Sequence, residues 1–88
     1  MQQNHDSPTP QQLEAIKKAT AFAFGYSYGL SQSTNLTHYG EQAKRLREDL
    51  IAFGVMKADG VAIPEPYFQS YLDGLTKAER LIESISSC

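Results

Sequence analysis

Apolar residues recur at helical spacing in the first third of the chain. Leu13, Ile16 and Ala19 follow a period near 3.6 residues and lead, without a turn signal, into the aromatic-rich segment 19–30. We therefore expect one long helix over residues 10–30.

The segment 19–30 holds four of the nine aromatic residues and fits two periods. Read as a strand, it places all four rings on one face. Read as a helix, it groups them as two i,i+4 pairs, Phe22 with Tyr26 and Phe24 with Tyr28. We favour the helix because the helical period already runs through the residues before it.

The start of this helix carries matching capping signals. Thr9 fits the N-cap, Pro10 fits the first helical position, and Gln12 lies three residues after Thr9. These three residues predict a capping box that fixes where the helix begins.

Small residues form a second edge of the same helix, at Ala21, Gly25 and Gly29. A glycine inside a helix costs about 1 kcal/mol relative to alanine, so close packing is expected to compensate. We expect this edge and the aromatic residues to form a dimer interface or a ligand pocket, with packing into the monomer core as the alternative. The candidate residues are Phe22, Phe24, Gly25, Tyr26, Tyr28 and Gly29.

A second helix is predicted to begin between residues 35 and 37, after a polar loop. Gly54 can take the left-handed conformation that ends a helix, and Val55 can fold back on the last turn. The apolar positions at helical spacing are Tyr39, Ala43, Leu46, Leu50 and Phe53.

A third helix is predicted after a short connector at residues 61–63, with Pro64 and Pro66 in its first turn. We expect it to bend at Asp73-Gly74, with an interruption there as the alternative, and to fray from residue 84. Its predicted inward face comprises Phe68, Tyr71, Leu72, Leu75, Ala78, Ile82 and Ile85.

These elements predict an all-α fold, a small three-helix bundle with a long aromatic-rich first helix. Residues 1–8 are expected to form a flexible tail and residues 9–86 a single helical domain. With 88 residues, 41% hydrophobic and 20% charged, the chain has the composition of one globular domain.

The net charge and the cysteine content limit which partners and which cellular compartment we expect. A net charge of −2 gives no general attraction to nucleic acid or anionic membranes, so we expect neither as a partner. The single cysteine, Cys88, ends the chain, and the first fifteen residues lack the apolar core of a signal peptide. We therefore expect a cytoplasmic protein.

Residues that could carry chemistry are sparse. His38 and Glu41 are spaced to meet on one helix, as a metal site or an acid–base pair requires, but no inward-facing position on this helix is acidic. His5 and Cys88 lie at the chain ends, where no fixed partner is expected. We expect no enzyme activity, no cofactor and no bound metal.

Several short motifs occur in the order typical of one regulator family. Gly29-Leu-Ser-Gln-Ser-Thr34 precedes Lys44-Arg-Leu-Arg47, which is followed by Gly54-Val55 and by the turn at Asp59-Gly60. In this order they resemble the winged helix-turn-helix regulators. The resemblance implies a recognition helix whose nucleic-acid contacts would be Lys44, Arg45 and Arg47, and a wing after Gly54.

We expect a non-catalytic interaction or adaptor module that self-associates, as a homodimer, through the aromatic and small-residue faces of the first helix. One alternative is a small DNA-binding regulator of the winged helix-turn-helix type. The other is a small-molecule binding module with an aromatic pocket.

Overall fold

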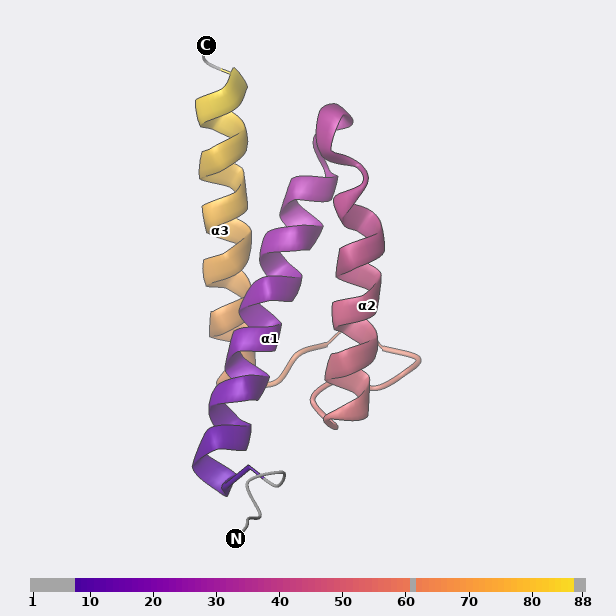
Figure 1. Cartoon of the computed structure of the whole chain (residues 1–88), viewed down its shortest axis with the longest axis vertical. Coiled ribbons are helices and arrows are strands. Elements are labelled where there is room, and N and C mark those ends of the chain that lie inside the picture. The colour runs from indigo at the N-terminus through magenta and orange to yellow at the C-terminus, as the bar shows by residue number, and fades with distance from the viewer. Residues whose placement is uncertain (1–7, 61, 87–88) are drawn as a thin grey trace, which may run out of the picture.

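A computed structural model describes residues 8–60 and 62–86, in which three α-helices and no strand occur (Figure 1). The helices are α1 (Pro10–Ser31), α2 (Tyr39–Ala52) and α3 (Tyr67–Ser86), with a short 3₁₀ helix, η1 (Thr34–Leu36), between the first two. The predicted all-α three-helix fold is confirmed. The tail at residues 1–7, Val61 and Cys88 lie outside the described residues.

The predicted capping box at the start of α1 is present. The Thr9 hydroxyl accepts a hydrogen bond from the Gln12 backbone N–H at 3.1 Å, and the Gln12 side chain accepts one from the Thr9 N–H at 2.9 Å. Both bonds satisfy N–H donors that the first turn of a helix leaves without partners. The helix therefore begins at Pro10, as the sequence predicts.

The second helix starts later than predicted, at Tyr39, because η1 occupies part of the preceding loop. Its end follows the prediction. Gly54 has a φ of 81°, and its N–H donates to the Ile51 carbonyl at 3.0 Å while the Val55 N–H donates to the Leu50 carbonyl at 2.9 Å. This is the Schellman arrangement, and it turns Val55 back into the core, where it is buried.

Replacing Gly54 with alanine is expected to lower the free energy of unfolding by about 1–2 kcal/mol. A Cβ at this position would meet no atom within 4 Å, so the whole cost comes from holding a side-chain-bearing residue in the left-handed conformation. Urea denaturation of the two proteins measures the difference. A loss below about 0.3 kcal/mol would mean that the turn takes another conformation in solution.

The third helix begins at Tyr67, just after the two prolines, and not at the prolines themselves. A residue that precedes proline is disfavoured in the helical conformation, so Pro66 delays the start until it has been passed. From there α3 continues through Asp73 and Gly74 to Ser86 without a break. The predicted alternative of an interruption at Gly74 is therefore wrong.

The long first helix lies between the other two, with α2 and α3 on either side of it (Figure 1). Both main helix–helix interfaces therefore involve α1. A buried cluster of Ala21, Leu50, Val55 and Met56 joins α1 to the end of α2 and the connector.

Glycines bring α1 and α3 into backbone contact. A Cβ added at Gly25 would overlap the Tyr71 carbonyl oxygen, and one added at Gly74 would overlap the Phe22 carbonyl oxygen. Gly29 is also buried, and a Cβ there would lie 2.7 Å from the Cβ of Ala78. The edge that we expected to face a second copy of the chain therefore packs against α3 of the same chain, which corrects the placement of Gly25 and Gly29 in a dimer interface.

A hydrogen bond between the N-terminal ends of α1 and α3 is expected to make the free energy of unfolding depend on pH in the alkaline range. The Tyr67 hydroxyl donates to the Glu14 carboxylate at 2.7 Å. This bond, with burial and the negative charge of Glu14, raises the pKa of Tyr67 above 10.0. The folded state thus holds the phenolic proton more tightly than the unfolded state, so the stabilisation is complete below about pH 10 and lost as pH rises through the folded pKa.

Urea denaturation of the wild type and of Tyr67→Phe between about pH 8 and about pH 11 tests this dependence. The gap in stability between the two proteins is expected to narrow above about pH 10, because the wild type loses a bond that the variant never makes. A gap that stays constant over this range would show that Tyr67 does not titrate with folding.

Candidate ligand-binding groove

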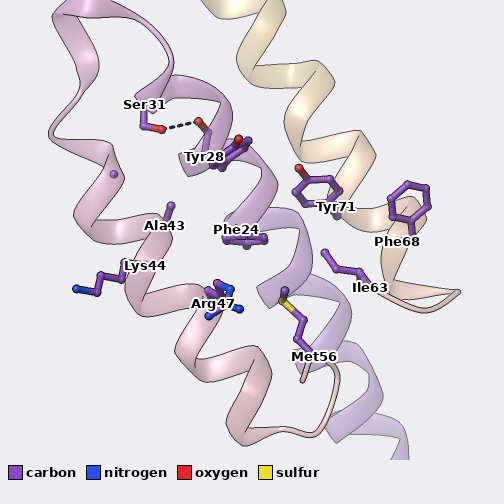
Figure 2. A pocket seen from close by; sticks show the side chains of 11 residues that line it. Phe24, Tyr28, Ser31, Ala43, Lys44, Arg47, Met56, Ile63, Phe68 and Tyr71 are labelled. Atoms are coloured by element: carbon purple, nitrogen blue, oxygen red, sulfur yellow. Dashed lines mark hydrogen bonds between the residues drawn. The ribbon is translucent and has the colours of Figure 1, made fainter. Parts of the chain in front are cut away.

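The face of α1 that lies between α2 and α3 is open and forms an apolar groove. We call it the aromatic groove (Figure 2). It has a volume of about 630 Å³. Its walls come from all three helices and from the connector between α2 and α3. The residues that line it are Phe24, Tyr28, Ser31, Gly40, Ala43, Lys44, Arg47, Met56, Ile63, Phe68 and Tyr71.

Four aromatic rings follow one another along this groove. The Phe24 ring lies 5.6 Å from the Tyr71 ring and 6.2 Å from the Tyr28 ring, measured between centroids, and Phe68 lies 6.1 Å from Tyr71. These separations are typical of interacting aromatic pairs. Tyr28 and Phe68 remain 43% and 39% exposed, so the row offers ring surface to a ligand.

The helical interpretation of the aromatic segment is confirmed, and it divides the four rings of α1 between two sites. Phe24 and Tyr28 line the aromatic groove. Phe22 and Tyr26 line a second groove between α1 and α3, with Asp73, Thr76, Lys77, Arg80 and Leu81. The four aromatic residues that we expected to act together are therefore divided between these two grooves.

Hydroxyl groups occupy one end of the aromatic groove, on Tyr28 and Tyr71 (Figure 2). Burial, together with electrostatic repulsion from Tyr28, raises the pKa of the Tyr71 phenol above 10.0. Ser31 instead donates its hydroxyl proton to the Tyr28 carbonyl at 2.6 Å. Near neutral pH the Tyr71 phenol is therefore protonated, and it can donate or accept a hydrogen bond at this end.

A guanidinium group lies toward the other end. Arg47 lies beside Met56 and Phe24 in Figure 2, whereas the Lys44 ammonium extends from α2 away from the rings. One terminal nitrogen of Arg47, Nη2, donates to the carbonyl oxygens of Ala58 at 3.2 Å and Gly60 at 2.8 Å. These two bonds tie the connector to α2 and hold the guanidinium at the groove.

These positions bear on the resemblance to winged helix-turn-helix regulators. Residues 55–60 and 62–66, where the wing would lie, contain no strand, so the implied wing is wrong. Lys44 and Arg47 both line the aromatic groove, and Arg45 is exposed outside it. Two of the three residues implied as nucleic-acid contacts therefore line the groove.

Seven of the eleven residues that line the groove were not predicted as site residues. Phe68 and Tyr71 were assigned to the inward face of the third helix and Ile63 to the connector, whereas Met56 was given no role. Their apolar periodicity predicts that they face the interior. Residues that pack in a core and residues that line an apolar groove show the same pattern, so the sequence does not distinguish them. The spacing of Phe68 and Tyr71, three residues apart on one face, was the only available signal that two aromatics would lie together.

Other residues considered for chemistry lie apart from this groove. His38 is exposed, and its ring is tilted by 36° against the Tyr39 ring, with 4.4 Å between the centroids. No group of three histidine, cysteine or acidic side chains is placed to hold a metal ion within the described ranges. None of the described helices has the length and apolar character needed to cross a membrane.

Comparison of the chain with known protein families, with curated proteins and with solved structures finds no match.

Proposed function

We propose that this protein is a non-catalytic binding module that holds a small apolar molecule in the aromatic groove. The observation that carries the proposal is the aromatic groove itself, an open face of α1 between α2 and α3. Two aromatic rings of α1 and two of α3 line it. A volume of about 630 Å³ lies within the range of about 300–1,000 Å³ that is typical of small-molecule sites.

The composition of the groove supports binding of an apolar ligand body. Aromatic, aliphatic and methionine side chains make up most of its walls, and its few polar groups lie near its two ends. Apolar walls with a small number of placed polar groups are typical of ligand sites, where the walls supply affinity and the polar groups fix orientation. A ligand seated there would contact all three helices.

Binding of a neutral aromatic probe, 4-phenylbutyramide, tests the proposal. Amide chemical-shift changes in a ¹H–¹⁵N spectrum are expected to map to the residues around Phe24, Tyr28 and Tyr71. Tyr28→Ala is expected to weaken binding about fivefold, because it removes an exposed ring from the groove wall. Tyr26→Ala removes the same ring from the other side of α1 and serves as the matched comparison.

Equal losses of affinity in the two variants, or shifts that cluster at the second groove, would contradict binding in the aromatic groove and indicate a site between α1 and α3.

Light scattering on a sizing column distinguishes a small ligand from a second copy of the chain as the occupant. A monomeric mass is expected, because the glycine edge that favoured a homodimer is covered by α3. A dimer whose mass falls to that of a monomer in Tyr28→Ala would instead assign the groove to self-association.

A further inference from the structure

We infer that Arg47 is the anion-recognition residue of the aromatic groove and that the ligand is an apolar carboxylate. This inference rests on the proposed binding function and adds the chemical class of the ligand. Three observations carry it: the position of the guanidinium, its donors that have no acceptor among residues 8–60 and 62–86, and the absence of acidic residues among those that line the groove.

Arg47 is held in place but not saturated. A guanidinium group carries five N–H donors in a rigid plane. The two donors of Nη2 are used by the Ala58 and Gly60 carbonyls. The three donors on Nε and Nη1 have no acceptor among the described residues. A group fixed by one nitrogen, with the others free, is preorganised to receive an acceptor from a ligand.

The charge of Arg47 is also unbalanced within the described part of the chain. Both of its hydrogen bonds go to neutral carbonyl oxygens, and it forms no ion pair there. Arg47 is half-buried, beside the apolar side chains of Met56 and Phe24. A charge that is partly removed from water gains more from an opposite charge than a fully solvated one does. An anionic ligand would supply that charge.

The shape of the free donors selects a carboxylate. A planar guanidinium pairs with the two oxygens of a carboxylate through parallel N–H···O bonds. Because Arg47 is the only cation that faces the rings in Figure 2, one negative charge is enough to balance it. With the carboxylate at Arg47, the body of the ligand would extend over Phe24 toward the Tyr28 and Tyr71 hydroxyls.

The second groove is a weaker candidate for such a ligand. Lys77 and Arg80 line it, but so does the Asp73 carboxylate, which would repel an anion. All of its lining residues come from two helices, α1 and α3. The aromatic groove therefore offers the better match, with an apolar wall and a positive charge that has no acidic residue among those lining the groove.

Calorimetric titration of the wild-type protein with 4-phenylbutyrate and with 4-phenylbutyramide tests the inference. The two probes have the same shape and differ in charge. The carboxylate is expected to bind about tenfold more tightly, because it forms charge-assisted bonds that the neutral amide lacks. Equal affinities would overturn the inference and leave the proposed function standing, whereas binding of neither probe would overturn the proposed function as well.

Variants locate the charge that produces this preference. Arg47→Gln is expected to bring the two affinities within about twofold of each other. Lys18→Gln, which removes a positive charge from an exposed position of α1 outside the groove, is expected to keep the tenfold difference. A preference that survives in a folded Arg47→Gln protein would overturn the role of Arg47.

A measurement on the wild type covers the case in which Arg47→Gln fails to fold because the connector is released. The Nε–H signal of Arg47 is expected to shift in the ¹H–¹⁵N spectrum when 4-phenylbutyrate is added and to stay in place when 4-phenylbutyramide is added. An Nε–H signal that does not respond to the carboxylate would contradict the assignment of Arg47.

Discussion

Replacing Gly25 with alanine is expected to destabilise the fold by at least about 3 kcal/mol. The added methyl group would overlap the Tyr71 carbonyl oxygen and would come within 3.1 Å of the Leu75 backbone nitrogen. Both obstacles belong to the backbone of α3, so no side-chain rotation can relieve the overlap. The two helices would have to separate along their whole contact, which would expose apolar surface on both.

The measurement is the free energy of unfolding from urea denaturation, followed by circular dichroism. Gly40→Ala is the matched control, because the nearest atom that a Cβ at Gly40 would meet outside its own helix is the Ser31 Cβ at 3.9 Å. Gly40 lies in the first turn of α2, where alanine is expected to be neutral or to stabilise by up to about 1 kcal/mol. A Gly25→Ala protein as stable as Gly40→Ala would show that the backbones of α1 and α3 do not touch in solution.

The contrast between these glycines shows what the sequence could and could not predict. A row of small residues predicts that another backbone comes close, and Gly25 and Gly29 do meet one. The same row does not indicate whether that backbone belongs to another helix of the same chain or to a second copy of the chain. The partner glycine, Gly74, was interpreted as a point of bending or interruption in the third helix, although its contact with Phe22 on α1 is the reason for a glycine there.

Helix ends were more predictable, because their signals are local. The Thr9 capping box and the Gly54 turn each depend on hydrogen bonds between residues no more than five positions apart. The aromatic groove depends instead on how α2 and α3 are placed around α1. Each of these helices shows an apolar face in its sequence, but periodicity carries no information on whether two such faces will meet.

The residues of the candidate site also depend on helix placement that the sequence does not predict. Phe24 and Phe22 are two positions apart, and a helix turns by about 200° over that interval, so they lie on nearly opposite sides of α1. The sequence places them on different sides, but only the positions of α2 and α3 decide which groove each of them faces. Arg47 was grouped with Lys44 and Arg45 because they are close in sequence, whereas its hydrogen bonds to residues 58 and 60 are formed across the connector.

The second large effect is expected for Leu50→Ala, at about 3–5 kcal/mol. Leu50 has no exposed surface and packs in the cluster that Ala21, Val55 and Met56 complete. Its side chain fills the junction where the Schellman turn brings the chain back against α1, so its removal leaves a cavity that three separate segments would have to collapse to fill. The loss is a large part of the total stability of about 5–15 kcal/mol that is typical of a domain.

Leu46→Ala is the matched control, because it makes the same change one turn earlier on α2, where the side chain is half-buried. It is expected to cost about 1–2 kcal/mol. Urea denaturation of both variants gives the comparison, and similar slopes against urea concentration would show that the two denatured states are equally exposed. Equal losses at the two positions would show that the core is centred nearer the middle of α2 than the turn at Gly54. The burial of Val55 by that turn would then contribute little to stability.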